Sequence, residues 1–399
     1  SIIAFTFVGC GGGDSETDSI SDSASDSLME SSSSWGPMKV IKKCRRNKCD
    51  AFSSKVDGYL REVLTDSNDN IYAVVTSDGF PHGVIASFLG LNNVVVSKFD
   101  STGEWLWTRV YGSGYTDEVT DAVMLGSEIV FSAFSGGDFT TNPTCCGAIR
   151  AFVVNIDLEG DINWTSSLGP DLGSTTYVSR LLVDAGDIYF VGSSSADLDG
   201  GGHLGGGDAY VAKMSSAGSL MAVRSFGTSE FDHGYDLAKK PSGEIVASMV
   251  SSVGTSGTTY QISDHSFNDL LSLQSSTNTQ ALTSGVQYNR VVSKRILVER
   301  ETFDVGGNRY VASVSGAVAT ITKYNSSAVQ LWQSVFDFSG ETPAVTYLDL
   351  GGLSVSPNGN IIFGLTTDYA TARDSNGLMM PSYISILSPD GQVLNGINW

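Results

Sequence analysis

The sequence has few basic residues and few histidines, and both shortages limit the functions open to it. Lysine and arginine number 23 against 43 aspartates and glutamates, so the formal net charge is −20. A chain with this charge repels nucleic-acid phosphates, and we expect no nucleic-acid partner. The four histidines form no HxxxH or HxH pair; they are His82, His203, His233 and His265. The sequence therefore gives no catalytic motif built on histidine, and we assign no catalytic residue and no cofactor.

Glycine, in contrast, is abundant. The 399 residues include 45 glycines, and 41% of the residues are hydrophobic. Glycine marks turns, so this composition with few helix formers predicts short strands and many loops. The apolar content is enough for a large core. An all-β chain of this length is often a single barrel or propeller.

The amino-terminal run is apolar but short. Residues 1–9 read SIIAFTFVG, which is too few to span a bilayer, because a span takes about 20 residues. The run fits the end of a signal peptide. Phe7-Val8-Gly9-Cys10 resembles the bacterial lipobox, which implies that the thiol of Cys10 carries a diacylglycerol anchor with palmitate. The alternative is an ordinary signal peptide with an incidental cysteine. Gly11, in place of aspartate, implies the outer membrane by the same resemblance.

Three regions follow from this pattern: a signal-peptide remnant at 1–9, a lipidated tether at 10–50 and a β-propeller at 51–399. Residues 11–34 are mostly Gly, Ser, Asp and Thr, and such a segment buries too little surface to fold. A basic stretch at 39–48 follows it. That stretch either touches phosphates of the membrane surface or an acidic patch of the propeller, or forms a solvated collar.

The propeller prediction rests on a repeated segment. Its clearest copy ends in Gly103-Glu-Trp105-Leu-Trp107. Six copies occur, the fourth of them degenerate with Asn268 in the glycine position; they span 96–107, 154–164, 212–222, 263–272, 322–332 and 386–395. Successive copies lie 50 to 63 residues apart, and a period of about 40–60 residues is typical of propeller blades. We therefore predict six blades of four strands each.

The chain ends suggest how the ring closes. Residues 94–100 and 104–111 read as an inner hairpin, and 119–125 and 128–134 as an outer hairpin of the same blade. Residues 56–76 then look like an outer pair alone, and residues 383–399 like an inner pair alone. We predict that these N- and C-terminal strands pair in one blade, which would remove free sheet edges.

The segment Gly206-Gly207-Asp208-Ala209-Tyr210-Val211-Ala212-Lys213 resembles the bacterial propeller-repeat family labelled SBBP, whose units read like G-G-x-D-A-F-V-A-K-x-D-x-x-G-x-x-x-W. The resemblance covers most of residues 55–399 and is weak in the fourth blade. It implies a propeller outside the cytoplasm and implies no reaction. The family label suggests seven blades, whereas we count six.

Cysteines beyond Cys10 form two close pairs. They are Cys44, Cys49, Cys145 and Cys146, an even number in an exported protein, so we expect disulfides. Local pairing is favoured, and cross-pairing between the two clusters is the alternative. A vicinal disulfide at 145–146 also occurs in quinone-dependent alcohol dehydrogenases, which this chain resembles in little else. An oxidising compartment argues against zinc.

Two acidic loops are weaker candidates for a site. Asp197, Asp199 and Asp208 lie in one Gly-rich loop, and their carboxylates suit calcium, although the spacing matches no EF-hand and a plain solvated turn is the favoured interpretation. Another loop contains Glu230, Asp232 and His233, a carboxylate–histidine group capable of acid–base chemistry, again with a solvated loop as the favoured interpretation.

The repeated tryptophans Trp107, Trp164 and Trp332 are predicted to pack between blades. The long loops at 77–93, 135–150, 192–208, 251–259 and 367–382 are predicted to form the binding face. We predict a lipid-anchored, non-enzymatic binding or scaffold module of the outer membrane, with a protein or glycan partner. One alternative is an envelope enzyme with its site in the propeller channel, which convergent Arg, Asp and His side chains there would favour. A further alternative is a subunit of a larger surface assembly.

Overall fold

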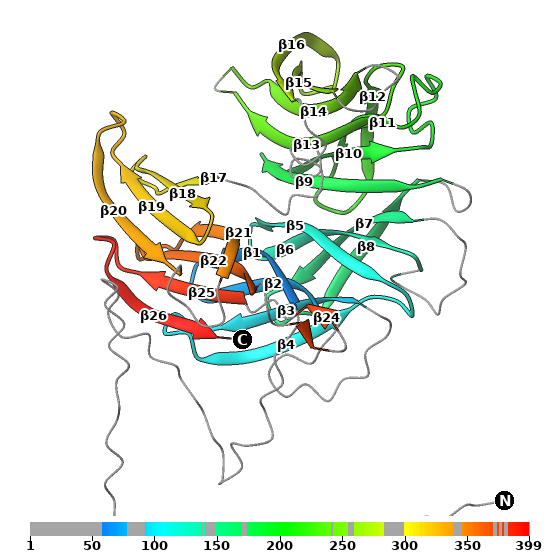
Figure 1. Ribbon diagram of the computed structural model, residues 1–399. Coiled ribbons are helices and arrows are strands. Elements are labelled where there is room, and N and C mark those ends of the chain that lie inside the picture. Colours follow the sequence, from blue (N-terminus) through cyan, green and yellow to red (C-terminus); the bar gives the residue numbers. More distant parts are fainter. Residues whose placement is uncertain are drawn as a thin grey trace, which may run out of the picture. The chain divides into compact units, whose positions relative to one another are not determined.

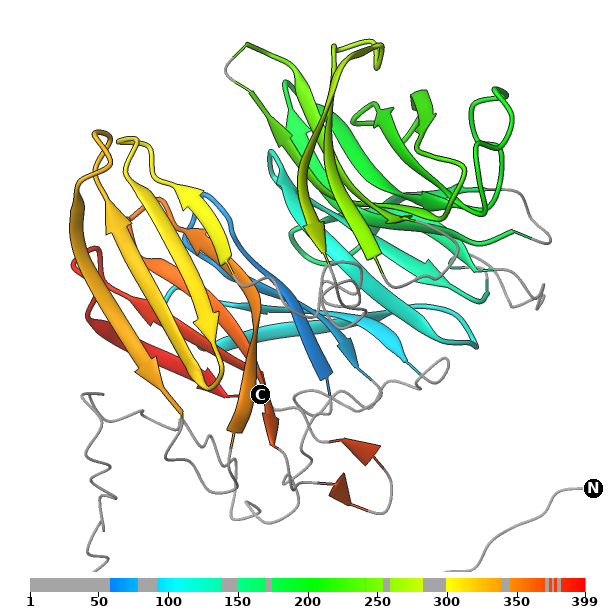
Figure 2. The same ribbon diagram turned by 45° about the horizontal axis from the view of Figure 1, so that its top comes forward.

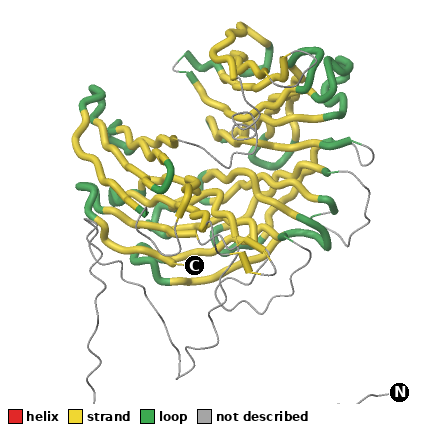
Figure 3. Tube along the Cα trace, in the orientation of Figure 1, coloured by secondary structure: helices red, strands yellow, loops and turns green. Residues whose placement is uncertain are grey.

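The computed structural model describes the chain from residue 58 onward, with gaps. The described residues are 58–77, 92–137, 139, 149–169, 174–240, 242–253, 259–282, 299–338, 345–369, 373–374, 377–378 and 382–398. Residues 1–50 and all five cysteines lie outside them, so the lipid on Cys10 and the pairings of Cys44, Cys49, Cys145 and Cys146 remain predictions. The described residues form strands and loops (Figure 3). No helix among them is long and apolar enough to cross a membrane.

Six antiparallel sheets of four strands each make up the described chain (Figure 1). Sheet 1 contains β1 (Gly58–Thr65), β2 (Ile71–Ser77), β3 (Asn93–Phe99) and β4 (Trp105–Tyr111). Sheet 2 contains β5 (Asp117–Leu125), β6 (Glu128–Ser135), β7 (Arg150–Asp157) and β8 (Ile162–Leu168). Sheet 3 contains β9 (Thr176–Asp184), β10 (Asp187–Ser194), β11 (Asp208–Met214) and β12 (Leu220–Phe226).

The second half of the chain repeats this plan. Sheet 4 contains β13 (Asp232–Lys239), β14 (Ile245–Val253), β15 (Thr259–Phe267) and β16 (Leu273–Leu282). Sheet 5 contains β17 (Glu299–Phe303), β18 (Arg309–Ser315), β19 (Val318–Tyr324) and β20 (Gln330–Asp337). Sheet 6 contains β21 (Val345–Val355), β22 (Ile361–Tyr369), β25 (Ser382–Leu387) and β26 (Val393–Asn398), and a small ribbon joins β23 (Arg373–Asp374) to β24 (Gly377–Leu378). The prediction of a six-bladed β-propeller is thus confirmed.

The predicted closure is wrong. The strands of each sheet lie in chain order, with β23 and β24 left out of sheet 6. Figure 2 shows this order for β17 to β20, the yellow to orange strands. The N-terminal strands pair with β3 and not with the C-terminal strands, which pair with β22. The repeated segment shows that one blade contains two hairpins. Because the two hairpins alternate along the chain and both are antiparallel, either one could come first in a sheet. The sequence therefore did not determine which hairpin begins a sheet. The prediction took the second hairpin of each sheet as the first hairpin of a blade.

The first strand of each sheet lies at the centre of the propeller. β1 contacts β5, β5 contacts β9 and β9 contacts β13; β17 contacts β21, which contacts β1. We call these six first strands the central strands. The hairpins predicted as outer are therefore the inner ones. The described residues give no comparably extensive contact between β13 and β17, so closure of the ring at that junction is not found.

Apolar side chains fill the junctions between neighbouring sheets. β2 and β3 are buried along their whole length, because sheets pack on both of their faces, and both strands accordingly read as near-continuous valine-rich runs. The junction of sheets 6 and 1 is one such cluster, in which Leu60 and Val63 of β1 meet Ile362, Ile384 and Ile386. The first and last sheets therefore pack face to face without sharing a strand.

The repeated turn and tryptophan lock successive sheets together. A Cβ atom at Gly218 would lie 2.6 Å from Trp164, and one at Gly391 would lie 2.8 Å from Trp332. Both glycines have positive φ, so glycine is required there for backbone reasons as well. The indole Nε1 of Trp332 donates to the carbonyl oxygen of Pro389 at 3.0 Å. These tryptophans pack between blades, as predicted.

The fourth blade keeps this turn with different residues. Leu271, with φ of 56°, occupies the position of the turn glycine, and its amide donates to the carbonyl oxygen of Asn268 at 2.9 Å. Asn268 therefore takes the place of Asp100 and not of Gly103, which corrects the sequence alignment. The partner in sheet 3 is Ala222, which packs against the cluster containing buried Leu271. A large turn residue and a small partner replace the usual glycine and tryptophan.

Candidate active site

The central strands carry a β-bulge at one recurring position. A bulge lets two consecutive side chains point to the same side of a strand and commonly re-aims a functional residue. Five central strands have a register shift four or five residues before the last residue of the strand. The extra residues are Arg61, Thr120, Ser179, Tyr235 and Gly351.

A charged residue follows the bulge in most of these strands. The residues after the bulges are Glu62, Asp121, Arg180, Asp236 and Gly352. β17 begins at the corresponding point, and counting back from its turn at Asp304 places Arg300 at the equivalent position. We call Glu62, Asp121, Arg180, Asp236 and Arg300 the charge ring. Five of the six central strands thus contribute one ionisable side chain each.

Ion pairs connect the charge ring across sheets. Arg180 lies 3.3 Å from Asp121 through Nη1 and 3.3 Å from Asp236 through Nε. Arg300 pairs with Oε2 of Glu62, and its Nη2 donates to the carbonyl oxygen of Arg61 at 3.1 Å. Arg61 in turn lies 3.9 Å from Glu118. Arg180 links sheets 2, 3 and 4, Arg300 links sheets 1 and 5, and Arg61 links sheet 1 to sheet 2.

The sixth position of the ring is a glycine because Glu62 occupies the space beside it. A Cβ atom at Gly352 would lie 2.5 Å from Oε1 of Glu62 and would also collide with the backbone nitrogen of Val63. Gly352 has φ of 145°, a conformation that L side chains rarely adopt. The missing side chain on β21 leaves room for Glu62 of β1 to meet Arg300 of β17.

Burial changes the ionisation of these groups. Burial raises the pKa of Glu62, and nearby Asp121 raises it further, against the opposing effect of Arg300. For Arg180 burial alone acts to lower the pKa, but the carboxylates of Asp121, Asp236 and Glu62 outweigh it and raise the pKa. Burial, followed by Asp236 and Asp264, raises the pKa of Tyr235 to about 12. Arg180 therefore stays charged, while Glu62 holds its proton to higher pH than an ordinary glutamate.

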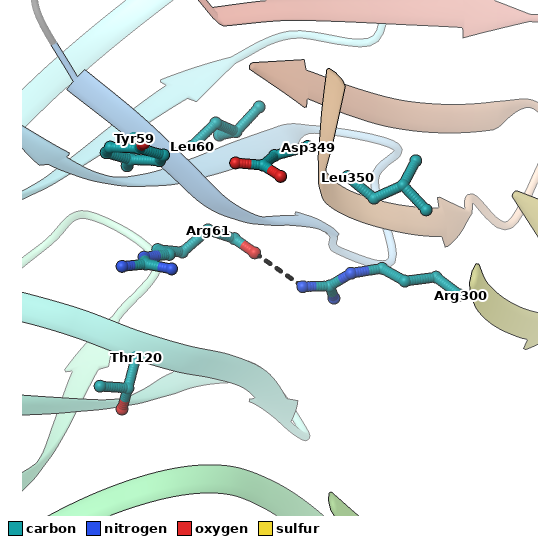
Figure 4. A pocket seen from close by; sticks show the side chains of 7 residues that line it. All are labelled: Tyr59, Leu60, Arg61, Thr120, Arg300, Asp349 and Leu350. Carbon is teal, nitrogen blue, oxygen red and sulfur yellow. Dashed lines mark hydrogen bonds between the residues drawn. The ribbon is translucent and has the colours of Figure 1, made fainter. Parts of the chain in front are cut away.

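A small polar pocket opens beside the charge ring (Figure 4). Its volume is about 10 Å³, which is room for about one water molecule. Residues from four central strands line it: Tyr59, Leu60, Arg61, Thr120, Arg300, Asp349 and Leu350. Asp349 is buried and supplies a carboxylate, while Arg61 and Arg300 supply positive charge and Tyr59 and Thr120 supply hydroxyl groups. Charged and polar side chains therefore converge at the centre of the propeller.

The three loop carboxylates predicted for calcium each serve a separate local contact. Asp197 accepts hydrogen bonds from the amides of Gly200 and Gly202. Asp199 accepts from the amide of Ser225, and Asp208 accepts from the amide of Leu204 at 3.0 Å. Within the described residues no group of three or more His, Cys, Asp or Glu side chains is placed to hold a metal ion. The structure thus does not bring these carboxylates together around one point.

The residues at 230–233 also separate. Glu230 is exposed, whereas Asp232 is fully buried and accepts a hydrogen bond from the amide of Thr228 at 2.6 Å. His233 is buried between two hydroxyl groups, at 3.1 Å from Oγ of Ser179 and 2.9 Å from Oγ of Ser193. His233 belongs to sheet 4 and both serines to sheet 3. The histidine therefore joins two sheets and does not form an acid–base group with Glu230.

Sequence reasoning missed the charge ring and the pocket. The signal was present, because residues 62, 121, 180, 236 and 300 recur with the blade period. The recurrence of these charged residues was not recognised for two reasons. The copies of the repeat were aligned on the turn after the third strand, and the first hairpin was assigned to the outer side of the propeller. Asp349, at 6% exposure, has no distinguishing motif around it in the sequence.

No protein-family model matches the chain. A curated relative, the regulatory protein FlaEY of Caulobacter vibrioides, is 24% identical over 288 residues, which cover 68% of this chain and 28% of that protein. The chain thus spans little more than a quarter of that relative's length.

Several solved structures resemble the fold of this chain. An α-L-arabinanase of Penicillium chrysogenum is 13% identical, covers 85% of this chain and 95% of its own, and has a TM-score of 0.48. The NanB sialidase of Streptococcus pneumoniae is 10% identical, covers 86% and 69%, and has a TM-score of 0.47. An α-L-arabinofuranosidase of Fusarium graminearum is 10% identical, covers 83% and 93%, and has a TM-score of 0.46.

These findings correct the prediction of a non-enzymatic binding or scaffold module. The likeness to the arabinanase, the sialidase and the arabinofuranosidase is one of fold alone. The centre of the propeller itself holds arginine and carboxylate side chains within hydrogen-bonding distance. Convergence of Arg, Asp and His was the feature that would favour the alternative, an enzyme with its site in the propeller; arginine and carboxylate groups meet there, and no histidine lines the pocket in the described part of the chain. The sequence could not show it, because the residues are separated by more than 50 positions.

Proposed function

We propose that this chain is a hydrolase that cleaves a glycosidic bond at the pocket beside the charge ring. The observation that carries the proposal is the meeting of Asp349, Arg61 and Arg300 around a cavity of about one water molecule. A buried carboxylate beside a water-sized cavity is suited to take a proton from an attacking water. The arginines and the hydroxyl groups of Tyr59 and Thr120 are suited to hold the oxygen atoms of a sugar.

Hydrolysis of a glycosidic bond also needs a proton for the departing oxygen. Glycosidases usually use two carboxyl groups for this purpose, one as base or nucleophile and one as acid. Asp349 supplies the first. Glu62 is the second carboxyl group of the cluster, and its raised pKa suits it to deliver a proton. Arg300 pairs with Glu62 and lines the pocket with Asp349, so it connects the two carboxyl groups.

The test separates the two roles by leaving group. The full chain is assayed on a panel of 4-nitrophenyl glycosides and on the matching disaccharides, including arabinosides and sialosides. Asp349→Asn is expected to lose about 10²- to 10⁴-fold in rate on both kinds of substrate. Glu62→Gln is expected to lose more on disaccharides, whose leaving group needs a proton, than on nitrophenyl glycosides.

A matched variant controls for folding and charge. Asp390→Asn removes one carboxylate from the exposed turn before β26 and should leave all rates unchanged. If Asp349→Asn is as active as wild type on every substrate that wild type cleaves, the proposed role of the pocket is wrong. If wild type cleaves no member of the panel, the proposal of a glycoside hydrolase fails.

We further propose that the enzyme is anchored at the bacterial outer membrane through Cys10, where it meets its glycan. The support is the resemblance of residues 7–10 to a lipobox. Mass spectrometry of the mature amino terminus tests the anchor. A diacylglycerol-modified Cys10 supports it, and an unmodified terminus at another residue contradicts it.

A further inference from the structure

The carboxylates around the pocket outnumber the arginines. Three arginines, Arg61, Arg180 and Arg300, are joined or adjacent to five carboxyl groups; these are Glu62, Glu118, Asp121, Asp236 and Asp349. With Glu62 protonated, as the proposed function requires, four carboxylates still face three arginines. Each arginine already lies within 4 Å of at least one carboxylate. The whole chain, these groups included, carries a formal net charge of −20. An incoming anion would therefore find no uncommitted arginine and would face excess negative charge.

One donor of the pocket still needs an acceptor. The side chain of Arg300 is 10% exposed, and its Nε has no hydrogen-bond partner within the described part of the chain. A buried N–H without a partner is costly, and native structures usually satisfy it with protein, water or ligand. Because Arg300 lines the pocket, an oxygen atom of a bound ligand would supply the missing acceptor. An uncharged hydroxyl oxygen meets this need without adding negative charge.

We infer, on the basis of the proposed function, that the substrate is an uncharged, polyhydroxylated sugar and not an acidic one. The surrounding carboxylates accept hydrogen bonds from sugar hydroxyl groups, and Arg300 donates to a sugar oxygen. A uronic or sialic acid carboxylate would meet the surplus carboxylates at short range, where like charges repel strongly in a poorly solvated site. Charge balance at the propeller centre thus determines the substrate class.

Matched substrate pairs test this inference. The full chain is given 4-nitrophenyl hexosides and the corresponding hexuronides, which differ only in a hydroxymethyl group against a carboxylate. We expect kcat/KM to be at least tenfold lower for the hexuronide at low ionic strength. Asp236→Asn removes one surplus carboxylate that is 46% exposed. This variant should bring the kcat/KM values for the hexoside and the hexuronide closer together. Asp390→Asn removes the same charge from a distant turn and should leave the ratio unchanged.

The outcomes distinguish this inference from the proposed function. Equal or faster cleavage of the hexuronide overturns the inference and leaves the hydrolase proposal standing. If neither member of any pair is cleaved, the hydrolase proposal fails. The inference is then tested by measuring the dissociation constants of the same pairs by calorimetry. Tighter binding of the neutral member then supports it, and equal or tighter binding of the hexuronide overturns it.

Discussion

Gly352 of β21 lies against the carboxylate of Glu62 on β1, so that a Cβ atom at position 352 would approach Oε1 of Glu62 to 2.5 Å. The glycine allows Glu62 to reach Arg300 on a third strand, 238 residues away in the sequence. One missing side chain therefore permits an ion pair that links sheets 1 and 5.

Gly352→Ala is predicted to destabilise the fold more than Gly243→Ala does. Both glycines have positive φ, but nothing lies within 4 Å of a Cβ atom at Gly243. Gly243→Ala therefore costs only the backbone strain, roughly 1–2 kcal/mol. Gly352→Ala adds collisions with Glu62 and with the backbone of Val63. Urea unfolding of both variants measures the difference, and equal losses would contradict the crowding.

The Glu62–Arg300 pair is predicted to be strongly coupled. Both side chains are about nine-tenths buried, and removing one partner of a buried pair costs about 3–5 kcal/mol because the other charge stays buried. Glu62→Ala with Arg300→Ala should therefore cost less than the sum of the single variants. Arg309 and Glu301, 3.3 Å apart and 39% and 54% exposed, form the control pair. Their coupling should be about 0–1 kcal/mol, and a similar value for both pairs would contradict the prediction.

The sequence predicts the turns of this structure better than the arrangement of its strands in sheets. Gly103, Gly160, Gly218 and Gly391 take positive φ in one recurring turn, which is a local requirement and is legible in the sequence. The number of blades followed from these positions. The assignment of hairpins to sheets depends on contacts between distant strands, and for that reason the predicted closure failed.

The site was harder to predict than the fold. Glu62 and Arg300 are brought together by strands at opposite ends of the chain, and Asp349 joins them from a third strand. No spacing rule relates these residues, apart from the shared blade period of Glu62 and Arg300. The charged residues at 230–233 are adjacent in the sequence, yet Asp232 and His233 bind different partners. Consecutive residues of a strand point to opposite faces of the sheet, so neighbours in the sequence can contact different partners.

The contact between Ala222 and Leu271 is predicted to tolerate exchange with the usual pair. Ala222→Trp alone overfills the junction of sheets 3 and 4 and should cost about 1–3 kcal/mol. Leu271→Gly alone removes a side chain that is 1% exposed and should cost about 2–5 kcal/mol. The double variant recreates the arrangement of Trp164 and Gly218, so its loss should be smaller than the sum. Additive losses in thermal or urea unfolding would refute this.

Stability is predicted to fall as the pH drops below about 6.5, in part because of His265. Burial lowers the pKa of His265 from its ordinary value of 6.5, and its ring lies 3.0 Å from Ser263 and 2.9 Å from Ser276. The unfolded chain takes up a proton below 6.5 that the folded chain resists, so acid favours unfolding. His265→Gln should lose less unfolding free energy between pH 7.5 and 5.0 than wild type. An equal loss in His265→Gln and in wild type would exclude this role.

Chemical rescue of Asp349→Ala tests the central claim most directly, namely that the pocket is an active site. The variant removes the carboxylate beside the water-sized cavity and leaves space for a small anion. The account predicts that Asp349→Ala loses at least about 10²-fold in hydrolysis of a glycoside that wild type cleaves. It also predicts that formate or azide restores part of this rate without changing the wild-type rate. Full activity of Asp349→Ala, or a loss that neither anion restores although the variant is folded, would contradict the account.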